Sequence, residues 1–125
     1  MRKHACALFV YGTLKRGFRN HYLIEHGLYV SDKSISGFDM IQLDYADFPA
    51  LLPGGNGDIH GEVFLIDDET LRTTDRLEGH PNIYLRVKVG VIIYDGVDYD
   101  LFTYTMTRER IGDQKVKKIK SGNFK

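Results

Sequence analysis

Short apolar runs rich in β-branched and aromatic residues recur along this chain of 125 residues, separated by glycine-rich or polar turns. Such runs are typical of the strands of a compact sheet. We expect strands at residues 5–10, 35–43, 59–66, 87–93 and 99–104, and a loop at the glycine-rich segment 53–58. Together with two short helical segments, this pattern predicts an α+β fold: a small mixed, barrel-like β-sheet with short flanking helices.

The Asp-Gly pair at 95–96 is the strongest turn signal in the sequence. Between two β-rich runs, Asp-Gly favours a two-residue type I′ hairpin turn. An unbroken register from that turn pairs Val89 with Phe102 and Val87 with Tyr104. We therefore expect Tyr104 to face the interior, where its hydroxyl needs a polar partner.

A helix is predicted from an aspartate N-cap at 67 or 68 to Glu78, with Gly79 just beyond its end. Leu71 and Glu78 are seven residues apart and therefore share one face of the helix. A carboxylate on the apolar face, at the negative end of the helix dipole, is disfavoured as an anion, so its pKa is expected to rise. Glu78 is a candidate general acid/base. The alternatives are a frayed last turn, a hydrogen bond between Glu78 and neighbouring backbone, or a structural salt bridge with an arginine such as Arg86.

The first apolar run ends abruptly at Tyr11-Gly12-Thr13-Leu14, directly before two basic residues. A small glycine-containing turn at the end of a buried strand is a candidate binding turn. After it, Asn20 is a plausible N-cap for a short helix that Gly27 would end.

Composition narrows the possible partners and compartment. Lysine plus arginine equals aspartate plus glutamate, 17 each, which argues against a surface built for nucleic acid. The single cysteine, Cys6, allows no internal disulfide and suits a reducing compartment. We expect one cytoplasmic domain over residues 1–125, with no signal peptide and no membrane span. The lysine-rich segment 115–125 is interpreted as a solvated tail; docking to nucleic acid or an acidic protein is the alternative.

Several familiar catalytic motifs are missing. The sequence has no Walker A loop, dinucleotide fingerprint, Gly-x-Ser-x-Gly elbow or His-Glu-x-x-His pair. Its five histidines lack the spacing of metal ligands. We therefore expect no metal and no cofactor. A glycosidase-like carboxylate pair of Glu62 and Glu78 stays an alternative, although a chain this small offers little cleft for a sugar chain.

Four stretches resemble one known family over nearly the whole chain: YGTLKRG (11–17), GEVFLID (61–67), LEGHPNIYLR (77–86) and SGNF (121–124), with a further tyrosine at Tyr104. They look like the γ-glutamylcyclotransferase-like group, which includes AIG2-like proteins and γ-glutamylamine cyclotransferases. The resemblance implies a barrel-like sheet and places the catalytic glutamate at Glu78. It implies that backbone groups of Tyr11, Gly12, Thr13 and Leu14 hold the γ-glutamyl group, and that Tyr84 and Tyr104 line the pocket or bond the substrate.

The reaction implied by the resemblance is an intramolecular aminolysis. A γ-glutamyl amine, for example γ-glutamyl-ε-lysine, closes to 5-oxoproline and releases its amine, with Glu78 as general acid/base and no cofactor. Asn123 and Phe124 stand where many relatives carry an acidic residue and a tryptophan. The alternative is a non-catalytic regulatory protein that binds a γ-glutamyl compound or another small ligand in the same fold.

Overall fold

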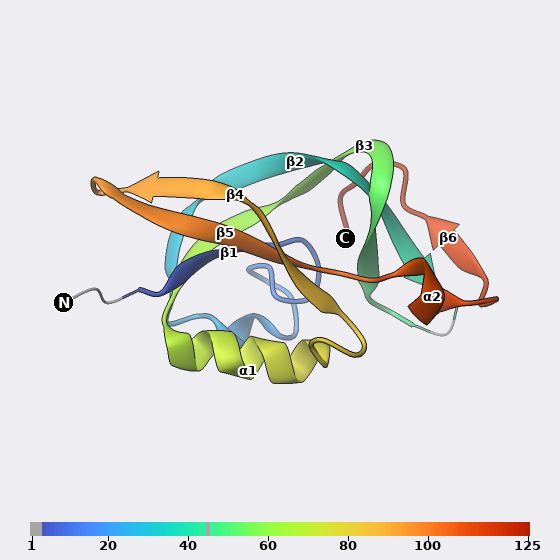
Figure 1. Cartoon of the computed structure of the whole chain (residues 1–125), viewed down its shortest axis with the longest axis horizontal. Helices are drawn as coiled ribbons and strands as arrows, with labels where there is room; N and C mark the ends of the chain where they lie inside the picture. The colour runs from blue at the N-terminus through green and yellow to red at the C-terminus, as the bar shows by residue number, and fades with distance from the viewer. Residues whose placement is uncertain (1–3, 45) are drawn as a thin grey trace.

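Six strands form one mixed, curled sheet in the computed structural model, which describes residues 4–44 and 46–125 (Figure 1). The strands are β1 (Cys6–Val10), β2 (Leu28–Leu43), β3 (Pro49–Ile66), β4 (Leu85–Tyr94), β5 (Val97–Thr105) and β6 (Val116–Lys118), in the spatial order β4-β5-β1-β3-β2-β6. β1 runs parallel to β5, whereas the other neighbouring strands are antiparallel. The predicted mixed, barrel-like sheet with short helices is confirmed as a curled half-barrel.

Strand β1 is buried along its whole length because it lies inside the sheet with a core on each face. Leu8 and Val10 belong to the core on the side of the helix, which also receives Leu71. Ala7 and Phe9 belong to the second core, on the other face of the sheet. The alternation of side chains along a strand explains this division. Strand β1 therefore contributes side chains to both cores.

Helix α1 (Asp68–Glu78) confirms the prediction, and both of its ends have the expected caps. The Asp67 carboxylate accepts a hydrogen bond from the Thr70 N–H at 2.8 Å. Gly79 adopts a left-handed conformation, with φ of 68°, and its N–H donates to the Arg76 carbonyl at 3.2 Å. In the described part of the chain, no helix has the length and apolar character needed to cross a bilayer.

The β4–β5 hairpin has the predicted turn but not the predicted register. Asp95 and Gly96 both have positive φ, 51° and 73°, as a type I′ turn requires. A β-bulge then inserts Val89 as an extra residue, so Arg86 and not Val87 lies opposite Tyr104. The predicted pairing is therefore wrong from the bulge onward. Tyr104 is nevertheless buried, as expected.

The strands β2 and β3 are much longer than predicted. Segment 53–58, expected to be a loop, lies inside β3. Phe38 of β2 pairs with both Pro53 and Gly57, so residues 54–56 bulge out between two stretches of regular pairing. Gly54 permits this with a φ of 90°. Pairing with β2 therefore outweighs the turn-forming composition of the segment.

One helix was predicted wrongly and another was missed. The helix expected after Asn20 is only the three-residue 3₁₀ turn η1 (His21–Leu23), and the Asn20 side chain does not cap it. The amide of Asn20 instead donates to the Thr13 hydroxyl at 2.9 Å. Helix α2 (Arg108–Ile111) was not predicted.

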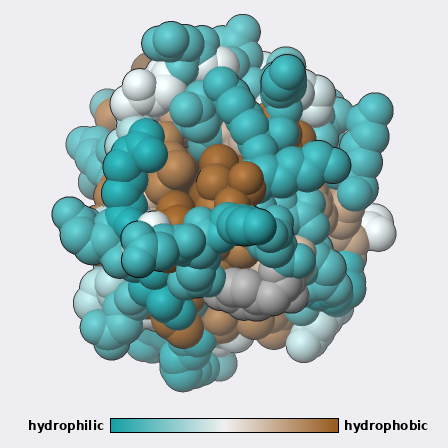
Figure 2. All heavy atoms as spheres, turned by 90° about the vertical axis from the view of Figure 1, so that its right-hand side faces the viewer, coloured by the Kyte–Doolittle hydropathy of each residue, from teal (hydrophilic) through white to brown (hydrophobic). Residues whose placement is uncertain are grey.

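The lysine-rich segment is not a free tail. Strand β6 pairs with the edge of β2, and Ile119 and Phe124 pack against the second core. The backbone N–H of His60 donates to the Gly122 carbonyl at 2.8 Å. The lysine side chains of the segment stay exposed, as do Val116 and Ser121. On the face that includes this region, hydrophilic residues frame a hydrophobic hollow (Figure 2).

Candidate active site

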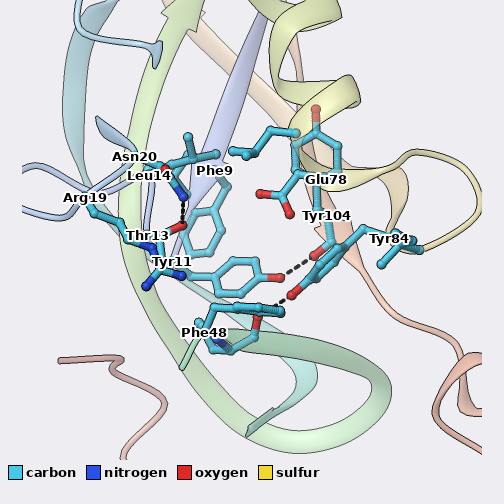
Figure 3. A pocket seen from close by; sticks show the side chains of 15 residues that line it. Phe9, Tyr11, Thr13, Leu14, Arg19, Asn20, Phe48, Glu78, Tyr84 and Tyr104 are labelled. Carbon is cyan, nitrogen blue, oxygen red and sulfur yellow. Dashed lines mark hydrogen bonds between the residues drawn. The ribbon is translucent and has the colours of Figure 1, made fainter. Parts of the chain in front are cut away.

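A pocket of about 240 Å³ opens at the end of β1, between the turn that follows this strand and the C-terminal end of α1 (Figure 3). Its lining residues are Phe9, Val10, Tyr11, Gly12, Thr13, Leu14, Arg19, Asn20, Phe48, Pro49, Leu77, Glu78, Ile83, Tyr84 and Tyr104. All seven residues that the sequence proposed for the site are among them. Segments far apart in the chain are thus brought to one cavity.

The Glu78 carboxylate points into the cavity, toward the ring of Tyr11 (Figure 3). Burial raises the pKa of this carboxyl to about 7. Within residues 4–44 and 46–125, no group donates a hydrogen bond to it. The alternative salt bridge is contradicted, because Arg86 Nε lies 3.0 Å from Asp75 Oδ1 instead. The Gly79 cap also argues against a frayed last turn.

The turn at residues 11–14 packs too closely against its surroundings for a side chain at Gly12. A Cβ there would lie 2.9 Å from Pro49 Cγ. The carbonyls of Gly12 and Thr13 accept hydrogen bonds from the N–H groups of Lys15, at 3.1 Å, and Asn20, at 3.0 Å. The N–H groups of Gly12, Thr13 and Leu14 donate to no acceptor in the described residues. Unused consecutive amides can bind an anionic or carbonyl oxygen.

Three buried tyrosine rings line the pocket, and each hydroxyl donates to a protein acceptor at 2.7 Å. Tyr11 donates to the Tyr104 carbonyl, and Tyr84 donates to the Pro49 carbonyl. Tyr104 donates to Asp75 Oδ1, with its hydroxyl directed away from the cavity (Figure 3). Burial raises the pKa of the Tyr11 phenol well above its ordinary value, so this hydroxyl stays protonated.

The rim of the pocket contains residues that the sequence analysis did not assign to it. The Arg19 guanidinium is held by Asp47, with N–O distances of 2.6 and 2.9 Å. Phe48 reaches the pocket from the segment before β3, and no sequence pattern indicated this because the contact depends on tertiary packing. Leu77 and Ile83 are 44% and 45% exposed at the end of α1 and just beyond it.

Other candidate groups lie outside the pocket. The Glu62 carboxylate accepts hydrogen bonds from the backbone N–H of Arg16, at 2.9 Å, and from its Nε, at 3.2 Å. Glu62 does not line the Glu78 pocket, so the glycosidase-like pair was wrong. Cys6 is buried, and burial raises the pKa of its thiol to about 11. Among the described residues, no three side chains of the metal-ligating types are grouped.

The sequence has clear relatives. A family described as gamma-glutamyl cyclotransferase, AIG2-like, matches residues 8–125. A putative gamma-glutamylcyclotransferase of Methanocaldococcus jannaschii is 33% identical over 102 residues, which cover 78% of this chain and 81% of that protein. The gamma-glutamylaminecyclotransferase of Rattus norvegicus is 34% identical over 99 residues, which cover 71% of this chain and 66% of the rat protein.

Solved structures share the fold. The crystal structure of an AIG2-like protein from Mus musculus superposes with a TM-score of 0.65 and 30% identity, covering 82% of this chain and 78% of that one. The crystal structure of an uncharacterized protein from Pyrococcus horikoshii superposes with a TM-score of 0.73 and 24% identity, covering 95% of this chain and 89% of that one. This second likeness concerns the fold alone. The match of the family over residues 8–125 and these relatives place the chain in the γ-glutamyl cyclotransferase, AIG2-like family of enzymes.

Proposed function

We propose that this protein converts a γ-glutamyl amine to 5-oxoproline and a free amine, with Glu78 as general acid/base. The observation that carries the proposal is a half-buried carboxylate without a hydrogen-bond partner in the described residues, which faces the pocket and has a pKa of about 7. A carboxyl with this pKa exchanges protons readily near neutral pH. The name of the rat relative, a gamma-glutamylaminecyclotransferase, supports an amine as the leaving group.

Substrate recognition is assigned to the turn at the end of β1. The free N–H groups of Gly12, Thr13 and Leu14 would bind an oxygen of the γ-glutamyl group, since Gly12 lets a ligand approach the backbone closely. The ring of Tyr11 would lie beneath the bound group. Tyr84 and Tyr104 would act as walls, because their hydroxyls already have protein acceptors.

In the proposed reaction, the substrate's α-amine attacks its own γ-amide carbonyl carbon. A new C–N bond closes the five-membered lactam, and the bond from that carbon to the leaving nitrogen breaks. Glu78 takes a proton from the attacking nitrogen and gives one to the leaving nitrogen, so it ends in its starting protonation state. The nucleophile belongs to the substrate, and holding its ring-closing conformer supplies much of the rate enhancement. Amides of the 12–14 turn would stabilise the developing oxyanion.

Release of 5-oxoproline tests the proposal. Purified protein is incubated with γ-glutamyl-ε-lysine, several γ-glutamyl amino acids and glutathione. The variant Glu78→Gln should lower the rate by about a hundredfold or more, the scale of a lost general base. Glu25→Gln is the matched control, because Glu25 is an exposed glutamate outside the pocket.

The alternative function, a non-catalytic binding protein, gives a different result in the same experiment. It predicts no lactam from any substrate, yet a higher melting temperature in the presence of a γ-glutamyl compound. Absence of both lactam and stabilisation would reject the assignment of the 11–14 turn as a binding turn.

A further inference from the structure

Tyr104 of β5 connects the two sides of the pocket. Its hydroxyl donates to Asp75 Oδ1 at 2.7 Å, and Asp75 lies on α1 three residues before Glu78. Its backbone carbonyl accepts the hydroxyl proton of Tyr11, the first residue of the binding turn, at 2.7 Å. The helix that carries Glu78 and the turn that would hold the substrate are therefore both hydrogen-bonded to one strand residue.

Asp75 is the centre of a partly buried network. Arg86 Nε of β4 donates to the same Asp75 oxygen at 3.0 Å, and the two side chains are only 22% and 21% exposed. Thr74 Oγ1 lies 2.8 Å from the Tyr104 hydroxyl oxygen. The Thr74 hydroxyl also lies 3.0 Å from the Leu71 carbonyl, so its one proton is shared between that carbonyl and the Tyr104 oxygen, whose own proton goes to Asp75. Charge-assisted bonds of this kind are stronger than neutral ones, and partial burial protects them from screening.

The polar side-chain contacts between α1 and the strands, in the described part of the chain, all involve Thr74 or Asp75. The Glu78 carboxylate has no hydrogen bond of its own there, so its position depends on how the helix is placed. We infer that Asp75 is a positioning residue, which acts through Tyr104 to fix Glu78 against the 11–14 turn. This inference rests on the proposed function.

Loss of the Asp75–Tyr104 bond should move or loosen the end of α1. A displacement of about 1 Å costs up to about a hundredfold in rate. It would also admit water to the Glu78 carboxylate, whose raised pKa has burial as its cause. The titratable and charged groups that line the pocket with Glu78 are Tyr11 and Arg19 from the segment after β1, Tyr84 from the segment after α1 and Tyr104 from β5. Behind Tyr104 lies the ion pair of Asp75, on the same helix, with Arg86 of β4.

Two variants separate the hydrogen bond from the charge. Tyr104→Phe removes the bond to Asp75 and leaves every charge in place, whereas Asp75→Ala also leaves Arg86 without its partner. We expect each to lower kcat tenfold to about a hundredfold, with KM changed by less than about threefold. The kcat of the double variant should be no lower than that of the less active single variant, because both substitutions remove the same Asp75–Tyr104 hydrogen bond.

A control on the same helix distinguishes positioning from general destabilisation. Asp67→Ala removes the N-cap bond to Thr70 at the far end of α1, so it should lower the melting temperature without changing kcat. A carboxyl-carbon NMR titration should show the pKa of Glu78 falling from about 7 in Tyr104→Phe but not in Asp67→Ala.

Failure of this inference can be distinguished from failure of the proposed function. Unchanged kcat and unchanged Glu78 titration in Tyr104→Phe, at a temperature where the variant is folded, would overturn the inference. If wild-type protein forms no lactam, the proposed function fails by itself. The NMR titration then still decides the positioning role: a lower Glu78 pKa in Tyr104→Phe supports it, and an unchanged one rejects it.

Discussion

Replacing Glu78 with glutamine should stabilise this protein at alkaline pH while it removes the proposed base. The folded chain holds the Glu78 proton more tightly than the unfolded chain does, because burial raises the pKa from its ordinary 4.5 to about 7. Below pH 4.5 the carboxyl is protonated in both states and costs nothing. Between pH 4.5 and about 7 the carboxyl ionises in the unfolded chain but stays protonated in the folded chain. The free energy of unfolding of the wild type therefore falls over this interval.

The magnitude follows from the two pKa values. The difference between about 7 and 4.5, at about 1.4 kcal/mol for each pH unit, corresponds to about 3 kcal/mol. This value is an upper figure because Glu78 is only half-buried and water still reaches part of the side chain. Glutamine has nearly the same shape as protonated glutamate and does not titrate. The stability difference between variant and wild type should therefore be small at pH 4 and up to about 3 kcal/mol at pH 8.

Urea unfolding of wild type, Glu78→Gln and Glu25→Gln at pH 4, 6 and 8 would measure the effect. Glu25 is exposed, so its variant should follow wild type across the series. An advantage of Glu78→Gln that stays the same from pH 4 to pH 8 would refute the reasoning, since it would mean that the carboxyl ionises equally well in both states. A Glu78→Gln variant that is less stable than the wild type at pH 8 would also refute it.

Four further results are expected. Lactam formation should increase with pH up to about 7, because the base form of Glu78 takes the first proton; a flat pH–rate profile would contradict this. Gly12→Ala should destabilise the fold by about 1–3 kcal/mol in thermal melts and raise KM, because its Cβ would lie 2.9 Å from Pro49 Cγ. Deleting residues 115–125 removes β6 and two packed apolar side chains, so urea unfolding should show a loss of at least about 2 kcal/mol. Glu62→Gln should leave lactam release unchanged, since Glu62 lies outside the pocket.

Features that depend on neighbouring residues could be predicted from the sequence. Asp67 and Gly79 set the ends of α1 through bonds that span only three to five positions. Asp95-Gly96 has the backbone freedom that its turn needs, independent of the rest of the chain. The helical period alone placed Glu78 on the buried side, with the raised pKa that desolvation produces.

Only the tertiary structure decided what depends on partners distant in the sequence. The bulge at Val89 and the continuation of β3 through segment 53–58 follow from pairing with another strand, which overrides local preference. Arg86 of β4 lies opposite Tyr104 of β5, and both side chains reach Asp75 on the helix. Arg86 therefore pairs with Asp75 and not with Glu78. No local pattern encodes that arrangement, since each contact joins elements that meet only after the sheet has curled. The sequence thus determined which carboxylate enters the pocket, and packing determined what holds it there.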